Sequence, residues 1–134
     1  MVPWCTFTDP ELARVGLTEV EARARFGNVK VYRYSFGDLD RALCDGEAVG
    51  LTKLVCTANG KIVGAHILGP QAGELVQEVV LAMKKGLSVG SLSQTIHAYP
   101  TLTEAVRRAA DLYYREKLFR GPLKGILRLL MRLG

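Results

Sequence analysis

The feature that most constrains this chain's fold is a pair of β-rich runs on either side of Asn59 and Gly60. Residues 51–57 and 61–69 are rich in Val, Ile, Leu and Thr. Asn-Gly is the dipeptide that best tolerates the positive φ angles at both central positions of a type I′ turn. The segment therefore predicts an antiparallel hairpin.

Helix signals lie on both sides of this hairpin. Thr18 and Glu21 have the spacing of a capping box, and Gly27 is placed to end the helix that they begin. Residues 74–85 carry apolar side chains at helical spacing, with Gly86 as the stop. The remaining expected elements are strands near 2–7, 13–16 and 29–36, connections at 37–46 and 88–95, and a last long helix from Thr101 or Thr103 to about Phe119.

The order of these elements predicts an α+β fold, an antiparallel sheet with helices packed on one side. It differs from the alternating βαβ order of nucleotide-binding folds. The length of 134 residues suits one domain, placed at 1–120 and followed by a tail at 121–134. Because the sequence has neither a Gly-x-Gly-x-x-Gly motif nor a phosphate-binding loop, we expect the chain itself to bind no nucleotide.

The positive charge is concentrated at one end of the chain. Residues 1–104 hold ten cationic and eleven acidic side chains, whereas residues 105–134 hold eight cationic and two acidic ones. No nucleic-acid-reading motif or group of interleaved aromatic residues accompanies this basic segment. A solvated helix face is therefore favoured over a nucleic-acid partner, and a basic nucleic-acid binder is kept only as a minor alternative.

The tail at 121–134 has the pattern of a cationic amphipathic helix. Lys124, Arg128 and Arg132 recur every fourth residue, and the other positions are mostly apolar. Docking on its own domain, or on domains that this chain lacks, is the favoured interpretation. A membrane-surface anchor is the less favoured alternative.

The cysteines point to a reduced, cytoplasmic protein. Cys5, Cys44 and Cys56 match neither a Cys-x-x-Cys redox pair nor a zinc spacing, so no metal site is expected. Cys56 lies in a β-rich run and is interpreted as a core thiol, and His66 as a packed histidine. The apolar runs are far too short to span a bilayer.

Three segments together resemble one protein family. They are residues 7–19 (FTDPELARVGLTE), 60–75 (GKIVGAHILGPQAGEL) and 97–105 (HAYPTLTEA). Their sequences, order and spacing are similar to the C-terminal dimerisation domain of flavin-dependent pyridine nucleotide disulfide oxidoreductases. The resemblance implies a homodimer in which this domain follows the FAD and nicotinamide domains of a parent enzyme. The chain alone is expected to be inactive and to hold no cofactor, while the parent uses FAD and NAD(P)H.

The resemblance also implies a site in the segment HAYPT. In the family, a loop ending in Pro-Thr reaches the partner subunit's flavin and redox disulfide, so Pro100 and Thr101 are the candidate cofactor contacts. A histidine before the proline acts as the base, oriented by a glutamate five residues later. Here Tyr99 replaces that histidine, Glu104 is retained, and His97 occupies a second family position. We therefore take Tyr99, Glu104 and His97 as candidate catalytic residues, and we expect the Tyr99–Pro100 bond to be cis.

The loss of the imidazole favours one branch of the family and leaves a second hypothesis open. A phenol is a poor base at neutral pH, which fits a mercuric-reductase-like parent whose thiolates carry a metal ion better than one that reduces an organic disulfide. The alternative is a stand-alone protein–protein interaction module that kept the fold without the chemistry. Arg107 and Arg108 are interpreted as a solvated face rather than as contacts to the flavin pyrophosphate.

Overall fold

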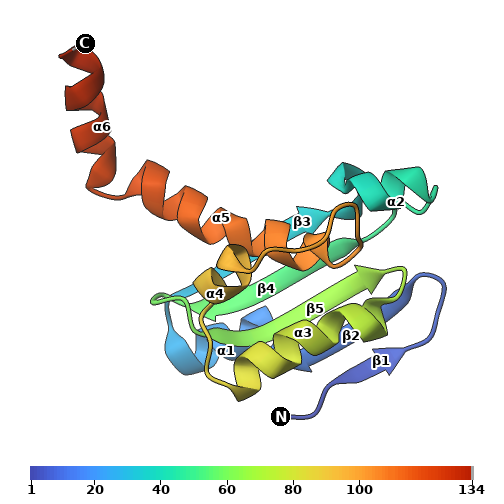
Figure 1. The fold of residues 1–134 in the computed structure, drawn as a ribbon. Coiled ribbons are helices and arrows are strands. Elements are labelled where there is room, and N and C mark those ends of the chain that lie inside the picture. Colours follow the sequence, from blue (N-terminus) through green and yellow to red (C-terminus); the bar gives the residue numbers. More distant parts are fainter. Residues whose placement is uncertain (134) are drawn as a thin grey trace.

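A computed structural model describes residues 1–133 of the chain, and Figure 1 shows its arrangement of strands and helices. The elements, in chain order, are β1 (Trp4–Thr6), β2 (Glu11–Gly16), α1 (Glu19–Phe26), β3 (Val29–Ser35), the 3₁₀ turn η1 (Phe36–Asp38), α2 (Asp40–Cys44), β4 (Leu51–Thr57), β5 (Ile62–Gly69), α3 (Ala72–Lys84), α4 (Val89–Gln94), α5 (Glu104–Arg120) and α6 (Leu123–Arg132).

The five strands form one sheet in the order β1-β2-β5-β4-β3, and every neighbouring pair is antiparallel. The predicted hairpin supplies the central strand β5 and its neighbour β4, in which Leu54 is paired with Ala65. Its connecting loop differs from the prediction. Only Gly60 has a positive φ, at 89°, and its amide donates to the Thr57 carbonyl at 3.0 Å. Of the expected type I′ pair, only the glycine therefore takes the left-handed conformation, as in longer hairpin loops closed by a glycine.

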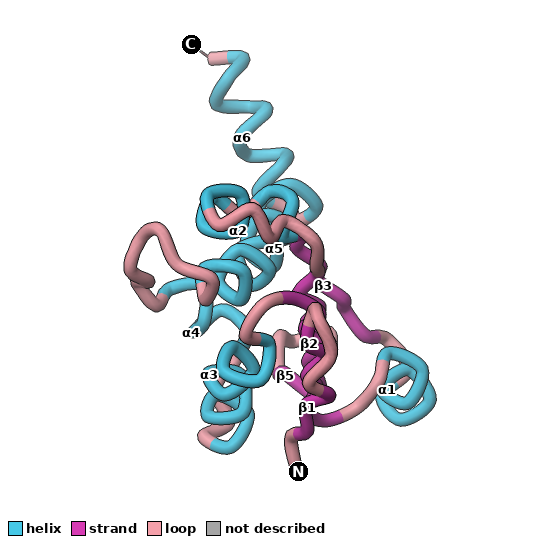
Figure 2. Tube along the Cα trace, turned by 90° about the vertical axis from the view of Figure 1, so that its right-hand side faces the viewer, coloured by secondary structure: helices cyan, strands magenta, loops and turns pink. Residues whose placement is uncertain are grey.

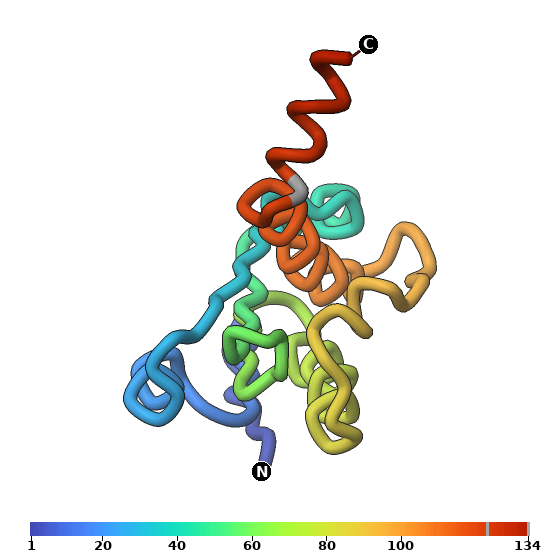
Figure 3. Tube along the Cα trace, turned by 90° about the vertical axis from the view of Figure 1, so that its left-hand side faces the viewer, coloured from blue at the N-terminus to red at the C-terminus, as the bar shows by residue number. Residues whose placement is uncertain are grey.

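The helices cover the two faces of the sheet unequally. Figures 2 and 3 show α3, α4 and α5 on one side and α1 on the other. The main core lies between the sheet and the three helices on the first side, where Leu54 and Ile67 of the sheet and Val79 of α3 are fully buried. A smaller core joins Ala22 of α1 to the opposite face. The α+β class is confirmed, and among the helices of residues 1–133 only α1 packs on the second face.

Two segments that were predicted as connections contain short helices. The connection at 37–46 forms η1 and α2, and the turn at 88–95 forms α4. Each short helix buries apolar residues, Ala42 in α2 and Val89 and Leu92 in α4. Helices of five or six residues are too short to show an apolar period in the sequence, and tertiary packing stabilises them instead.

The tail forms helix α6, which follows the end of α5 and extends away from the sheet. It follows Gly121 directly after α5, and its apolar side chains are largely exposed to solvent. Of the helices in residues 1–133, none is long and apolar enough to cross a membrane.

Candidate functional site

The candidate site is the loop that joins α4 to α5. Its Tyr99–Pro100 peptide bond is cis, as predicted. The loop presents two large side chains to solvent, since Ile96 is 91% exposed and Tyr99 is 66% exposed. Both side chains are therefore available for contact with another molecule.

Helix α2 holds the loop from one side. The Tyr99 hydroxyl donates a 2.7 Å hydrogen bond to Oδ2 of Asp40, and Nη1 of Arg41 lies 3.4 Å from the Pro100 carbonyl oxygen to which it donates. The hydrogen bond to Asp40, and secondly the carboxylate's negative charge, raise the pKa of Tyr99 above its ordinary value. The phenol is therefore neutral at physiological pH. Because the Tyr99 O–H already donates its hydrogen bond to Asp40, the phenol oxygen can act toward another molecule only by accepting a hydrogen bond or contacting a cation.

Glu104 holds the loop from inside the domain. It is the first residue of α5 and is only 3% exposed. Its Oε2 accepts a long hydrogen bond of 3.4 Å from the Thr101 amide, and the Thr101 hydroxyl donates to the Ala98 carbonyl at 2.7 Å. Within residues 1–133 no hydrogen bond joins Glu104 to Tyr99. In this chain, Glu104 therefore braces the loop backbone and does not orient the side chain before Pro100.

His97 is tied into the domain by both of its ring nitrogens. Nδ1 lies 2.9 Å from the Thr95 carbonyl oxygen, and Nε2 lies 2.8 Å from Oε1 of Glu78 on α3. The other oxygen of Glu78 accepts a 2.8 Å hydrogen bond from the Thr103 hydroxyl. The His97 side chain is only 6% exposed, so these contacts hold it inward and support the loop from α3. This geometry favours a positioning role over direct contact with a substrate.

The sequence did not indicate the residues that anchor this loop. Asp40 and Arg41 lie in a segment predicted to be a polar connection, and Glu78 lies on α3 among ordinary helix-forming residues. Each acts on a partner that is far away along the chain, 59 residues in the case of Asp40 and Tyr99. No local pattern in the sequence marks such a pair.

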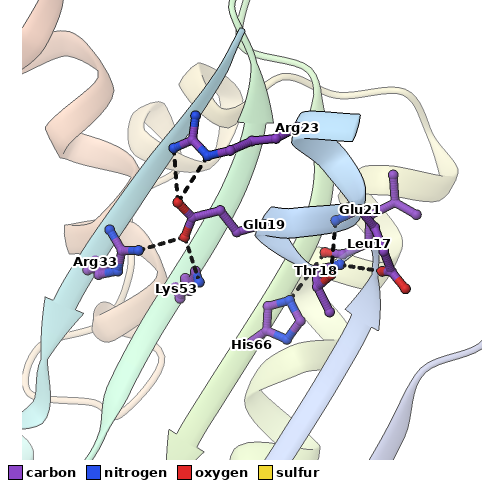
Figure 4. Close-up of polar contacts among 8 residues, drawn as sticks. All are labelled: Leu17, Thr18, Glu19, Glu21, Arg23, Arg33, Lys53 and His66. Carbon is purple, nitrogen blue, oxygen red and sulfur yellow. Dashed lines mark hydrogen bonds and ion pairs between the residues drawn. The ribbon is translucent and has the colours of Figure 1, made fainter. Parts of the chain in front are cut away.

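A second polar cluster lies on the opposite face of the sheet and holds α1 in place (Figure 4). Glu19 binds Arg23, Arg33 and Lys53 at 2.7 to 2.9 Å. The hydrogen bond from Lys53, followed by that from Arg23, lowers the pKa of Glu19 to about 2. Since each of the three cations binds the Glu19 carboxylate and so ties α1 to β3 and β4, we interpret this cluster as structural.

The capping box that begins α1 belongs to the same region and is confirmed. The Thr18 amide donates to Oε2 of Glu21 at 2.7 Å, and the Glu21 amide donates to the Thr18 hydroxyl at 3.2 Å. Nearby, Nε2 of His66 lies 3.2 Å from the Leu17 carbonyl oxygen, and burial lowers the pKa of this histidine. A half-buried, neutral and hydrogen-bonded ring agrees with the expected packed histidine.

The cysteines show no arrangement for redox or metal chemistry within residues 1–133. Cys56 is fully buried, and burial raises its pKa to about 12, in agreement with its interpretation as a core thiol. Cys44 is exposed, and Cys5 is partly buried. In this part of the chain, no group of three or more His, Cys, Asp or Glu side chains could hold a metal ion.

The sheet order and the helix placement are those of the dimerisation domain of disulfide oxidoreductases. Residues 2–110 match the family model described as "Pyridine nucleotide-disulphide oxidoreductase, dimerisation domain", and the chain belongs to this family. The match confirms the resemblance found in the sequence. The tail helix lies beyond the matched residues.

Comparison with curated relatives points to dihydrolipoyl dehydrogenases. The chain is 44% identical over 118 residues to the enzyme of Thermus scotoductus, covering 87% of this chain and 26% of the relative. It is 40% identical over 111 residues to the enzyme of Bacillus subtilis, covering 82% and 23% respectively. The chain thus spans about a quarter of the length of these relatives.

Solved structures of flavoprotein disulfide reductases have the same fold. The Cu(II) complex of the HOCl-induced flavoprotein disulfide reductase RclA from Escherichia coli superimposes with a TM-score of 0.79 at 27% identity, covering 83% of this chain and 25% of that protein. LpdA from Mycobacterium tuberculosis gives a TM-score of 0.78 at 26% identity, covering 84% and 25%.

Proposed function

We propose that this domain forms a two-fold homodimer within a FAD-dependent NAD(P)H disulfide oxidoreductase. In that assembly the loop at 96–101 of each copy would lie beside the redox dithiol and flavin of the partner subunit. The observation that carries the proposal is the exposure of Ile96 and Tyr99 on a loop that is held by residues of α2, α3 and α5. A fixed loop with an exposed apolar end is suited to enter a site on another subunit, because little conformational entropy is lost on docking.

The residues of this loop fit a contact with the edge of a bound flavin, and they do not fit a complete cofactor site. Pro100 is exposed beside the Tyr99 ring, and Thr101 is partly buried next to it, so both can lie against a planar ring. The cofactors FAD and NAD(P)H would supply the electrons from other domains of the parent. This chain's part is to exclude water from the dithiol and to hold Tyr99 near it.

Tyr99 supports a metal-handling, mercuric-reductase-like parent as the finer proposal. Its phenol is neutral and donates a hydrogen bond to Asp40, so it cannot serve as the base for a thiol at neutral pH. Its oxygen can contact a thiolate-bound metal ion. The similarity to RclA, a disulfide reductase whose structure was solved as a Cu(II) complex, is consistent with such a role. The relatives named dihydrolipoyl dehydrogenase favour an organic disulfide instead.

Oligomeric state tests the dimer. Sedimentation of the chain at concentrations on the order of tens of micromolar should show a dimer. Ile96→Asp should shift the chain toward monomer, because it places a charge in the proposed interface. Val20→Asp is the matched control, because Val20 is 77% exposed but lies on α1 on the other face of the sheet. A wild-type chain that sediments only as monomer would refute this part of the proposal.

The parent enzyme tests the role of Tyr99. In the protein that carries the flavin and nicotinamide domains, Tyr99→Phe should lower the rate of reduction of a thiophilic metal ion and leave the pH profile of disulfide reduction unchanged. A pH profile that loses its basic limb in Tyr99→Phe would show instead that the phenol acts as the base.

The stand-alone interaction module remains the second candidate, favoured by the replacement of the base. A coding sequence for a flavin domain with a Cys-x-x-x-x-Cys motif directly upstream of this segment would exclude the stand-alone module. The three free cysteines suit a reducing compartment, and we propose the cytoplasm for either candidate.

A further inference from the structure

Helix α6 is the part of the molecule that the dimerisation fold leaves unexplained. It lies beyond residues 2–110, which match the family model, and it extends away from the sheet (Figure 1). Its described apolar side chains are 39% to 78% exposed, and they are Ile126, Leu127, Leu129, Leu130, Met131 and Leu133. This set is too large and too continuous to be ordinary surface scatter.

The helix separates charge and apolar surface cleanly. At about 100° per residue, Lys124, Arg128 and Arg132 lie within an arc of about 80°, and the apolar side chains occupy about 200° on the other side. A helix that packs on its own domain needs an apolar stripe only about half as wide. With ten residues, α6 is also too short for a coiled coil with a second copy, which needs three or four heptads.

The helix also requires a partner for its own stability. A helix of ten residues is marginal in water, and Gly125 inside it weakens it further. No side chain caps its first turn. Burial of the apolar side chains against another surface would compensate for the short length, the glycine and the missing cap.

The charge of the segment indicates what that surface is. From Lys117 to Leu133 the chain holds five cationic side chains, counting Lys117 and Arg120 at the end of α5, and no acidic one. Phe119, 57% exposed, stands at the same end of α5. A short helix with a wide aliphatic face and a purely cationic polar face lies in the interface of a membrane that carries anionic lipids.

We propose that α6 binds the surface of an anionic membrane, with its apolar arc among the acyl chains and Lys124, Arg128 and Arg132 at the headgroups. In a dimer, two such helices would act together, and the second would bind at high effective concentration. The proposal is independent of the chemistry proposed for the Tyr99 loop.

Co-sedimentation of the whole chain with vesicles tests the proposal. The chain should bind vesicles of phosphatidylcholine containing roughly a third phosphatidylglycerol about a hundredfold more tightly than vesicles of phosphatidylcholine alone, because three cations act near the anionic surface. Binding should weaken with added salt. The circular dichroism signal of helix should increase when anionic vesicles are added.

Substitutions on each face of α6 distinguish the contributions of its apolar and cationic side chains to vesicle binding. Ile126→Ser with Leu130→Ser, at the centre of the apolar arc, should weaken binding at least tenfold. Replacing Lys124, Arg128 and Arg132 with Gln should abolish the preference for anionic vesicles, whereas Lys124→Arg with Arg128→Lys and Arg132→Lys should retain it. Val20→Ser, on exposed α1, is the matched apolar control and should bind as wild type does.

Three results would overturn the proposal. The first is equal binding of wild type and the Ile126/Leu130 variant. The second is a change in oligomeric state caused by that variant without vesicles, which would make a second copy the occupant. The third is slow tryptic cleavage at Arg128 in the parent protein without vesicles, which would show that another domain covers α6.

Discussion

Replacing Glu78 with alanine should destabilise the loop between α4 and α5 although it changes neither of the exposed residues, Ile96 and Tyr99. Glu78 accepts hydrogen bonds from His97 and Thr103 at 2.8 Å each, and these two residues lie at either end of the loop. Alanine leaves both donors without their partner. Because the His97 side chain is only 6% exposed, water cannot fully replace the lost carboxylate.

The size of the effect follows from these two contacts. A hydrogen bond to a charged group contributes about 1.5 to 3 kcal/mol, and we lower the contribution of the Thr103 bond to about 0.5 to 1.5 kcal/mol because water can bond the partly exposed hydroxyl after the substitution. The Glu78 side chain is 26% exposed, so the lower end of each range applies and the sum is about 2 kcal/mol. For a domain of this length, that loss lowers the melting temperature by about 6 to 8 °C.

Urea unfolding at one fixed protein concentration measures this loss, and Gln77→Ala is the matched control. Gln77 is the exposed neighbour on α3, and its amide donates to the Gly73 carbonyl of the same helix, with no other side-chain hydrogen bond among residues 1–133. Both substitutions gain the same small helix propensity, so their difference isolates the contacts to the loop. Hydrogen exchange of residues 97–103 should accelerate in Glu78→Ala alone.

Two results would refute this reasoning. One is a Glu78→Ala variant whose free energy of unfolding lies within about 0.5 kcal/mol of Gln77→Ala. The other is a Glu78→Gln variant as destabilised as Glu78→Ala, because the amide oxygen of Gln can still accept one of the two hydrogen bonds.

Three further predictions concern other groups. The pKa of Glu19 is lowered from 4.5 to about 2, so its ion pairs stabilise the fold above pH 4.5 and lose their effect as the pH falls toward 2. Glu19→Gln should therefore cost about 1 kcal/mol in urea unfolding at neutral pH and nothing near pH 2, and an equal cost at both would contradict this. Asp40→Asn should lower the pKa of Tyr99, measured as the tyrosinate absorbance step that Tyr99→Phe removes, and an unchanged midpoint would show that Asp40 does not raise it. In the folded chain a thiol reagent should label exposed Cys44 quickly and Cys56 only on unfolding, and equal rates would argue against a buried Cys56 with a pKa of about 12.

The sequence predicted the parts of the fold that local chemistry controls. The hairpin strands follow from β-branched runs on either side of Gly60, and the start of α1 follows from the reciprocal hydrogen bonds of Thr18 and Glu21. The cis bond before Pro100 was also expected. Each of these features depends on a few residues that are close together in the sequence, so it can be predicted without knowing the tertiary contacts.

The parts that the sequence did not predict depend on contacts between distant residues. Helices α2 and α4 form because the folded domain buries Ala42 and Val89, and their own propensity gives no signal. The anchoring of the loop depends on pairs such as Asp40 with Tyr99. Asp40 follows β3 and Tyr99 precedes α5, so the two residues come together only when α5 packs against β3 in the folded domain. The catalytic and cofactor-binding roles of Tyr99, Glu104, His97, Pro100 and Thr101 stay predictions.

The supports of the loop act mainly on its backbone and on His97, and only one of them uses the Tyr99 side chain. Arg41, Glu78 and the Glu104 carboxylate would keep their contacts if position 99 carried a different residue. The conformation of the loop therefore depends little on which side chain occupies position 99, and that side chain determines the reactivity. Natural selection could then exchange a proton acceptor for a phenol, or reverse that exchange, by one substitution and with no rebuilding of the surrounding fold.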